Sequence, residues 1–319
     1  MTNTKVLVTG AFGNVGSYIT SELLRQGYTP RLFDLGTSKN QQTAKQLAGK
    51  VEIVWGDVRH MDVVKKAVNG VDVVIHMAAI IPPLSNEQPE LARTVNIEGT
   101  RNLISASKAQ STPPRFFFAS TFDLFGYTQK LTPPRRMSDP IEATDVYTET
   151  KLLGETMVRE SDLDWLMFRF SDMPLIALRD PHPIMFEIPL DNRIETMHPA
   201  DAALAVVNAL KVSELWGQQK TLLVGGGKNC QITYYDFFSQ LLTAMGIGMF
   251  PEAAWTKKEY VTDWLDTEES QRLLQYQRHT FDEIVTEISA LLGWKRFFVP
   301  LARPFVRRAV LKLSPYWQK

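Results

Sequence analysis

The sequence has little cysteine and no excess of either charge. Cys230 is the only cysteine among 319 residues, which excludes a disulfide within the chain and a cysteine-based zinc cluster. Basic and acidic residues both number 35, so no net field would recruit nucleic acid. We therefore expect no metal site and no nucleic-acid partner.

Long apolar runs are also lacking. No stretch reaches the roughly 18 residues expected of a membrane span, and no charged-then-apolar leader pattern precedes the strand-like run at 5–8. The composition, 44% hydrophobic and 22% charged, is that of an ordinary globular protein. We expect a cytoplasmic protein without a transmembrane segment.

Short β-rich runs alternate with helical patterns over most of the chain. The predicted strands cover 5–9, 30–34, 51–55, 71–76, 115–119, 164–169 and 220–224. The predicted helices lie near 14–26, 61–69, 88–109, 146–160 and 199–211. Such alternation is typical of βαβ units, and it predicts an α/β fold with a Rossmann-type doubly wound parallel sheet.

The alternation lapses twice. Residues 171–195 hold four prolines, and after about 229 the segments 233–245, 267–276 and 280–292 favour helix. We expect a dinucleotide-binding domain of residues 1–170 plus 196–228. Residues 171–195 plus 229–319 would form a smaller, mostly helical substrate lobe.

The stretch "VTGAFGNVG" follows the first strand and opens a helix. Glycines there allow a sharp turn, a close approach of backbone N–H groups to a pyrophosphate, and tight packing of helix on strand. This context favours a dinucleotide-binding loop over a plain turn. The residues expected to line the cofactor are Gly10, Phe12, Gly13, Asn14, Val15 and Gly16.

The second strand ends in Asp34, some 20 residues after the loop. A carboxylate at that place can accept hydrogen bonds from both ribose hydroxyls of NAD and would repel the 2′-phosphate of NADP. Arg31, on the same strand, should point elsewhere. The sequence therefore favours NAD over NADP as cofactor.

Tyr147 and Lys151 are one helical turn apart on the same predicted face. A lysine at that distance, together with a positively charged nicotinamide, would lower the pKa of the phenol. The phenolate could then take the proton of an alcohol as hydride leaves its carbon. The pattern YxxxK is common by chance, and its alternative is an exposed pair without function.

Further motifs accompany this pair. They are "GDV" (56–58), "HMAA" (76–79), "VNIEGT" (95–100), "ASTFDLFG" (119–126), "MHPADAALA" (197–205) and "DTEESQRLLQYQ" (266–277). Together with the glycine loop and "YTETK", they resemble the extended short-chain dehydrogenase/reductase family, which includes NAD-dependent epimerases and dehydratases. The resemblance implies an enzyme and also a homodimer.

The resemblance also implies residue roles. Asp57 and Val58 would lie beside adenine, Ala78 and Ala79 would line the cofactor, and Asn96 would support the sheet end. Lys151 would additionally hold the nicotinamide ribose. His198 either contacts substrate or caps a helix at the lobe junction.

The segment "STFDLFG" supplies the expected hydroxyl. Thr121 matches the family's catalytic serine or threonine, Ser120 is the fallback, and Phe125 stands where the family has tyrosine. Dehydratases of the family carry two adjacent carboxylates at 122 and 123, whereas this chain has Phe122 and Asp123. Dehydration is therefore disfavoured, and Asp123 is either a substrate contact or a solvated loop carboxylate.

The stretch from Arg169 to His198 is short for a lobe that holds a sugar nucleotide, and it is rich in apolar residues such as Met173. We expect Met173 to contact the substrate. The favoured function is NAD-dependent hydride transfer with a small or partly apolar secondary alcohol or ketone. The alternatives are a sugar-nucleotide epimerase with tightly bound NAD and a non-catalytic NAD-binding sensor.

The last 27 residues, 293–319, carry seven lysines and arginines, no acidic residue and many aromatics. A basic amphipathic helix of this kind has three interpretations. It covers the lobe with a solvated basic face, makes peripheral contact with a membrane, or forms an oligomer contact.

Overall fold

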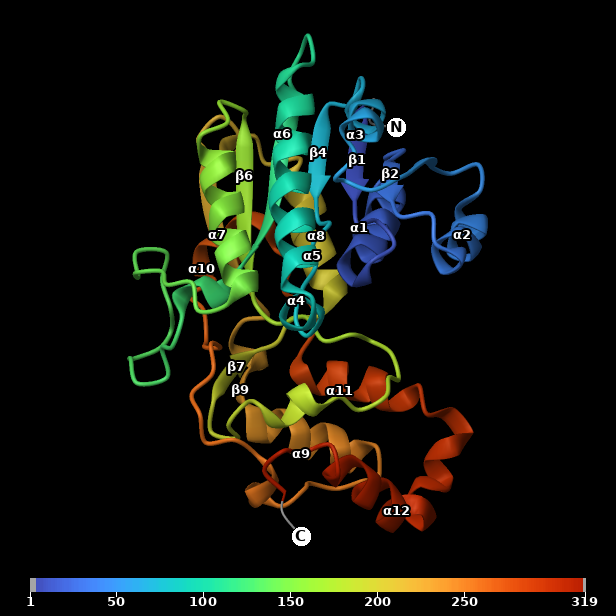
Figure 1. Cartoon of the computed structure of the whole chain (residues 1–319), viewed down its shortest axis with the longest axis vertical. Helices are drawn as coiled ribbons and strands as arrows, with labels where there is room; N and C mark the ends of the chain where they lie inside the picture. Colours follow the sequence, from blue (N-terminus) through green and yellow to red (C-terminus); the bar gives the residue numbers. More distant parts are fainter. Residues whose placement is uncertain (1–3, 318–319) are drawn as a thin grey trace.

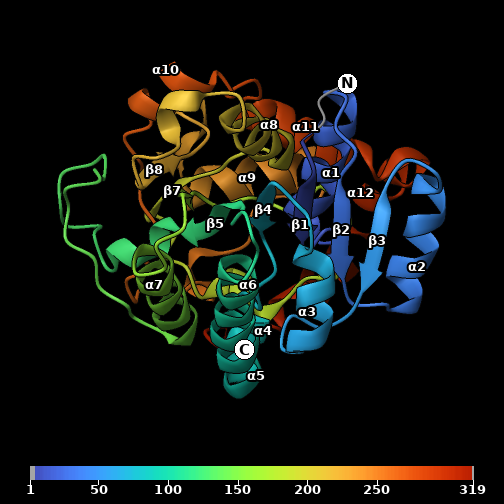
Figure 2. The same cartoon turned by 90° about the horizontal axis from the view of Figure 1, so that it is seen from above.

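The computed structural model describes residues 4–317 and is built on a seven-stranded parallel sheet (Figures 1 and 2). The strand order is β3-β2-β1-β4-β5-β6-β8, the arrangement typical of Rossmann-type sheets. The strands are β1 (Val6–Thr9), β2 (Arg31–Asp34), β3 (Glu52–Trp55), β4 (Val73–His76), β5 (Arg115–Thr121), β6 (Trp165–Phe170) and β8 (Lys220–Val224). The doubly wound parallel sheet predicted from the sequence is confirmed.

Helices cover both faces of this sheet, as Figure 2 shows from above. On one face lie α1 (Asn14–Arg25) and α8 (Pro199–Ala209), and on the other α3 (Met61–Val68), α6 (Gly99–Lys108) and α7 (Val146–Arg159). The central strands β1, β4, β5 and β6 are buried almost throughout, which explains their nearly continuous apolar sequences, whereas the edge strand β3 is only partly buried.

A second lobe lies beyond the carboxyl ends of the strands (Figure 1). It contains the antiparallel pair β7 (Arg193–Glu195) and β9 (Gln231–Thr233) and three helices, α9 (Tyr234–Ala244), α11 (Phe281–Ala290) and α12 (Val299–Leu311). Its core gathers Phe186, Tyr234, Phe250 and Trp255. The sequence patterns did not predict β7 and β9, because three residues are too few to show a strand period.

The remaining helices are short. They are α2 (Ser38–Ala44), α4 (Leu84–Glu87), α5 (Pro89–Arg93) and α10 (Glu268–Leu274). Helix α10 packs against β8 and α8, and Leu274 lies in the same apolar cluster as the sheet. The division into two domains at 170, 196 and 229 stays a prediction. We propose that 266–277 be counted with the larger domain.

Candidate active site

In the loop after β1, the backbone is packed so closely at Gly10 and Gly16 that neither position has room for a side chain. Gly10 has φ of +65° and donates its N–H to the carbonyl of Phe33. A Cβ on Gly16 would lie 2.0 Å from the carbonyl oxygen of Gly10, and one on Gly10 would lie 2.9 Å from Ala78. The backbone thus folds tightly at the start of α1, which is the cradle that a pyrophosphate needs.

Asp34 ends β2 beside this loop and is held by two backbone donors. Phe12 N–H donates to its Oδ2 at 2.8 Å, and Leu35 N–H donates to its Oδ1 at 2.7 Å. Arg31 points away, since its guanidinium pairs with Glu52 and donates to the carbonyls of Ala67 and Asn69. The cradle and the acid therefore fit a dinucleotide without a 2′-phosphate.

His76, at the end of β4, lies at the centre of a hydrogen-bond network with Thr9 and Thr100. Its ring lies 2.8 Å from Thr9 Oγ1 and 2.9 Å from Thr100 Oγ1. Thr9 Oγ1 also accepts the N–H groups of Met77 and Ala78. Burial lowers the pKa of His76 to about 3, so the ring stays neutral. The sequence analysis placed Ala78 and Ala79 here but assigned no role to His76 or Thr9.

Two further expected cofactor contacts, Asp57 and Val58, follow β3. Arg59 pairs with the Asp57 carboxylate at 2.6 Å and lowers its pKa. Val58 is buried against Gly99, where a Cβ would lie 2.5 Å from the valine side chain. Asp57 thus has a cation partner that the sequence analysis did not consider, and its contact with adenine stays a prediction.

Asn96 lies in a π-helical turn, Thr94–Glu98, between α5 and α6. Its side-chain amide bonds both the N–H and the carbonyl of Ile80, at 2.7 and 2.9 Å. It also donates to Thr150 Oγ1 on α7 at 2.9 Å. Asn96 therefore ties the loop after β4 to the helix that carries Tyr147, in keeping with its expected supporting role.

Helix α7 presents Tyr147 and Lys151 because of how it begins and how it packs. Asp145 caps the helix in a capping box with Thr148. Further along, a Cβ on Gly154 would lie 2.5 Å from the ring of Phe118. The missing side chain lets α7 lie directly on β5, so Tyr147 comes near Thr121 at the end of that strand.

The three expected catalytic side chains converge at this strand end. The Thr121 hydroxyl lies close enough to the phenol of Tyr147 to act against the rise of its pKa, and Thr121 Oγ1 accepts the N–H of Asp123 at 3.2 Å. Lys151 Nζ lies 5.8 Å from the centroid of the Tyr147 ring and donates to the carbonyl of Ala119 at 2.6 Å. All three side chains are buried.

The protein alone does not activate the phenol. Burial raises the pKa of Tyr147, and the charge of Asp123 raises it further. Burial also lowers the pKa of Lys151 to about 8. The lowering of the Tyr147 pKa that we predicted therefore does not come from Lys151 in the protein by itself. The positive charge of a nicotinamide, the other cause that we predicted, stays a prediction.

A second carboxyl group lies near Asp123. Asp172 follows β6 as Asp123 follows β5, and these strands are neighbours in the sheet. Its Oδ2 is buried without a hydrogen-bond partner among the described residues. Burial and then the charge of Asp172 raise the pKa of Asp123, and burial raises that of Asp172. The sequence analysis missed Asp172, because only the sheet order brings the two acids together.

The neighbours of Thr121 face away from the site. Phe122 and Phe125 are buried with Leu223 and Leu265, and the guanidinium of Arg169 lies 5.5 Å from the Phe125 ring centroid. Phe125 thus has a packing role in place of the family's tyrosine. Ser120 donates to Glu155 at 2.6 Å within a buried ion pair with Arg169. This geometry favours a supporting role for Ser120.

Met173 and His198 lie where the larger domain meets the second lobe. Met173 packs against the core of the sheet, and its carbonyl accepts from Asn14 of the glycine-loop helix at 3.5 Å. The buried ring of His198 caps α8, accepting from Ala200 N–H, and its Nε2 lies 2.9 Å from Glu287. These contacts are those of helix capping and lobe docking, and a substrate contact of either residue stays a prediction.

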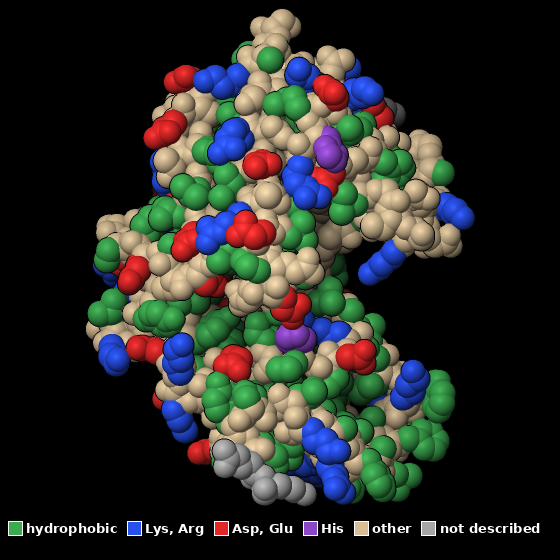
Figure 3. Space-filling model, in the orientation of Figure 1, with side chains coloured by type: hydrophobic (Ala, Val, Ile, Leu, Met, Phe, Trp, Pro, Cys, Tyr) green, Lys and Arg blue, Asp and Glu red, His purple; other side chains and the backbone are tan. Residues whose placement is uncertain are grey.

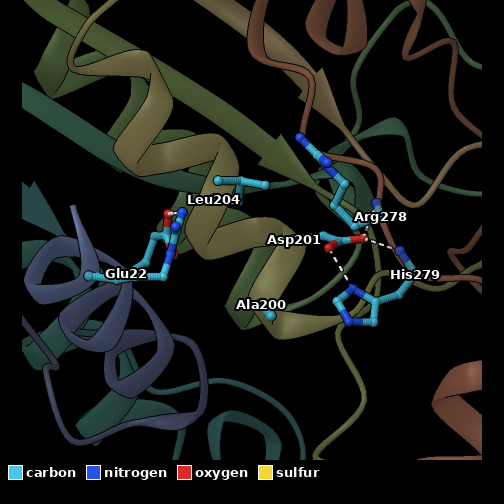
Figure 4. A pocket seen from close by; sticks show the side chains of 7 residues that line it. Glu22, Ala200, Asp201, Leu204, Arg278 and His279 are labelled. Atoms are coloured by element: carbon cyan, nitrogen blue, oxygen red, sulfur yellow. Dashed lines mark hydrogen bonds and ion pairs between the residues drawn. The ribbon is translucent and has the colours of Figure 1, made fainter.

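A surface pocket lies between α1 and α8, lined in part by Glu22, Leu204 and Arg278 (Figure 4). The Asp201 carboxylate there accepts the N–H groups of Arg278 and His279 and lies 2.6 Å from His279 Nδ1. The acid is thus fully engaged within the protein. The pocket includes neither Thr121 nor Tyr147 and is separate from the candidate active site.

The comparisons with known proteins agree with this architecture. The sequence profile of the NAD dependent epimerase/dehydratase family matches residues 6–172, just over half of the chain. The chain belongs to this family. The match ends at Asp172, the acid that lies beside Asp123. The resemblance predicted from the sequence motifs is confirmed.

Curated relatives within the family include dehydrogenases of steroids. A 3-beta-hydroxysteroid dehydrogenase of Mycolicibacterium neoaurum is 31% identical over 159 residues, 48% of this chain and 42% of the relative. A decarboxylating sterol-4-alpha-carboxylate 3-dehydrogenase of Bos taurus is 25% identical over 256 residues, 75% of this chain and 69% of the relative. The match to the first spans less than half of its length.

Solved structures show the fold over nearly the whole chain. A short-chain dehydrogenase/reductase superfamily protein of Agrobacterium tumefaciens with bound NAD has a TM-score of 0.71 at 21% identity, covering 95% of this chain and all of that one. UDP-glucuronic acid 4-epimerase of Bacillus cereus, in complex with UDP-glucuronic acid and NAD, has a TM-score of 0.75 at 20% identity, covering 91% and 99%.

Residues 4–317 contain no group of three or more histidine, cysteine, aspartate or glutamate side chains placed to hold a metal ion. None of the helices formed by these residues combines the length and the apolar character that crossing a bilayer requires.

Proposed function

We propose that this protein is an NAD-dependent oxidoreductase that transfers hydride between a secondary alcohol or ketone and nicotinamide. The observation that carries the proposal is the convergence of Thr121, Tyr147 and Lys151 at the end of β5, in a sheet whose first strand ends in the glycine cradle. In such sheets ligands bind at the carboxyl ends of the strands.

The side chains then have distinct roles. NAD, when bound, supplies the hydride acceptor. Tyr147 Oη takes the proton of the substrate hydroxyl, while Thr121 Oγ1 donates a hydrogen bond to the same oxygen and positions it. Lys151, close to the Tyr147 ring, is available to the nicotinamide ribose and, together with a positively charged nicotinamide, would favour the phenolate. In the reverse direction Tyr147 returns the proton to a carbonyl oxygen.

We further propose that Asp34 selects NAD. Replacing Asp34 with alanine removes the acceptor expected for the ribose hydroxyls and the charge that repels a 2′-phosphate. Each lost hydrogen bond to a charged group costs about 1.5–3 kcal/mol, so affinity for NAD should fall about 10- to 100-fold while that for NADP falls less. Titration of both cofactors by fluorescence measures this change.

Two variants make the Asp34 experiment specific. Asp34→Asn keeps an acceptor for the Phe12 N–H and should shift the preference without disturbing the loop. Asp62→Ala, at an exposed position of α3, should leave both affinities unchanged. A wild-type protein that prefers NADP would overturn this assignment.

The surroundings of Tyr147 favour an uncharged substrate. Asp123 and Asp172 lie near Tyr147, and burial raises the pKa of both, so protonated carboxyls there can donate hydrogen bonds to an uncharged oxygen but offer no cation to a diphosphate or carboxylate. This supports a neutral alcohol or ketone over a sugar nucleotide. Three other apolar residues of the stretch from Arg169 to His198, namely Met185, Phe186 and Ile188, belong to the core of the lobe.

A screen of substrates tests the proposal. Purified protein is mixed with NAD and a panel of secondary alcohols, hydroxysteroids, sugars and sugar acids, and NADH fluorescence is followed. We expect net NADH with at least one neutral alcohol. Conversion of a UDP-sugar without net NADH would instead establish an epimerase. Binding of NAD without turnover of any substrate would favour the sensor.

The remaining expectations concern the whole molecule. The homodimer and the cytoplasmic location stay predictions. Light scattering of the purified protein measures the first, and fractionation of the source cells measures the second.

A further inference from the structure

The C-terminal segment of residues 293–317 carries an exposed row of large apolar side chains. A 3₁₀ turn, Gly293–Phe297, leads into α12. Five side chains along it are between 56% and 78% exposed: Trp294, Phe297, Phe298, Leu301 and Phe305. We call these five residues the apolar ridge. Figure 3 shows hydrophobic and basic side chains side by side at the lower right, where Figure 1 places α12.

The ridge is held in place by the opposite face of the helix. Val306 and Val310 pack into the core of the lobe with Phe250. Arg307 donates to the carbonyls of Ile247, Gly248 and Met249 and lies over the Phe250 ring. The segment does cover the lobe, as one interpretation of the sequence held, but its outer face is apolar as well as basic.

The spacing of the ridge makes it one continuous strip. Phe298, Leu301 and Phe305 follow one another at intervals of three and four residues into α12, so that they share one side of the helix. The Trp294 ring of the 3₁₀ turn packs edge to face against Phe298, with the ring centroids 5.8 Å apart. Aromatic and large aliphatic side chains that gather on the solvent side of a helix mark a surface for a partner or a membrane.

The charges around the ridge indicate which of these it is. The exposed side chains of Lys295, Arg296, Arg303, Arg308 and Lys312 surround it, and no acidic residue follows Glu287. The seventh basic residue of the sequence prediction, Lys319, lies outside the described residues. An apolar strip of tryptophan, phenylalanine and leucine flanked by lysine and arginine is typical of helices that lie in the interface of anionic membranes.

We propose that residues 293–317 dock this protein on a membrane surface that carries anionic lipid headgroups. The ridge enters the boundary between headgroups and acyl chains, and the basic side chains contact the headgroups. A second copy is a poorer occupant, because a two-fold contact centred on the ridge would bring these lysines and arginines against themselves.

Vesicle sedimentation with the full chain tests the proposal. The probes are vesicles of phosphatidylcholine alone and of equal parts phosphatidylcholine and phosphatidylglycerol. We expect the wild type to sediment with the anionic vesicles and to be released by salt. Leu301→Ser/Phe305→Ser should weaken this binding at least about tenfold, since each side chain contributes buried apolar area. Lys295→Glu/Arg296→Glu should weaken it as well.

Matched variants keep the test falsifiable. Leu131→Ser/Leu153→Ser removes two exposed apolar side chains elsewhere and should bind vesicles like the wild type. Thermal unfolding confirms that each variant folds. The proposal is overturned if the wild type does not bind anionic vesicles, or if the Leu301→Ser/Phe305→Ser variant binds them as well as the wild type does. A ridge variant that instead dissociates a dimer, with no change in vesicle binding, would make the ridge an oligomer contact.

Discussion

Replacing Tyr147 with phenylalanine should abolish most turnover while leaving the fold intact. The substitution keeps the buried ring but removes the hydroxyl that lies near Thr121. A positioned general acid or base contributes about 10²- to 10⁴-fold to a rate, which corresponds to about 3–5 kcal/mol in the barrier. We therefore expect kcat to fall by about 10²- to 10⁴-fold, measured as NADH formation with the substrate found in the screen.

Two measurements separate a catalytic role from a structural one. NAD affinity, measured by fluorescence titration, should change little, because the lost hydroxyl acts on the substrate. Tyr235→Phe, the same change at an exposed position of α9, should leave kcat as it is. If the Tyr147→Phe protein keeps its full turnover, Tyr147 is not the catalytic acid or base, and the alternative of an NAD-binding sensor gains support.

The framework of the fold could be predicted because its signals are local. Each of the seven sheet strands is a short apolar run closed by polar or turn residues, and each lies within two residues of its predicted bounds. The glycine loop is equally local, since the close approach of Gly16 to Gly10 joins residues only six apart. Signals of this kind survive in a single sequence.

The rest of the candidate site depends on contacts between distant segments. Asp172 and Asp123 affect each other's protonation because β5 and β6 are paired, and no motif of the sequence marks Asp172 itself. The role of His76 likewise follows only from its hydrogen bonds to Thr9 and Thr100, which belong to two other elements. Phe125 looked like a tyrosine without its hydroxyl, whereas the structure gives it Arg169 as a partner.

A buried ion pair between distant segments supports the end of β5 next to Thr121. Glu155, one turn after Lys151 on α7, is fully buried. It accepts from Arg169 Nε at 2.8 Å, from Arg159 at 2.5 Å and from Ser120 Oγ at 2.6 Å. Burial alone would raise the pKa of Glu155, but Arg169 and the other donors lower it overall. The group is therefore ionised and fully partnered in the native protein.

Glu155→Ala should consequently destabilise the protein by about 3–5 kcal/mol, because it leaves the buried charge of Arg169 without its partner. Urea denaturation followed by tryptophan fluorescence measures the free energy of unfolding. Should the alanine variant fail to fold, Glu155→Gln, which keeps an acceptor for Ser120, should fold with a smaller loss.

A matched control lies on the same helix. Glu149 pairs with Arg93 at 2.9 Å on the surface, where the Arg93 side chain is 39% and the Glu149 side chain 47% exposed. Surface pairs contribute about 0–1 kcal/mol, so Glu149→Ala should change stability far less than Glu155→Ala.

Replacing both buried partners, Glu155→Gln with Arg169→Met, should recover part of the loss, since no charge is then left buried without a counter-charge. Equal losses for Glu149→Ala and Glu155→Ala would show that the buried pair does not hold α7 on β6. The placement of Tyr147 and Lys151 would then rest on other contacts of α7, among them the packing of Gly154 against Phe118 and the hydrogen bond of Asn96 to Thr150.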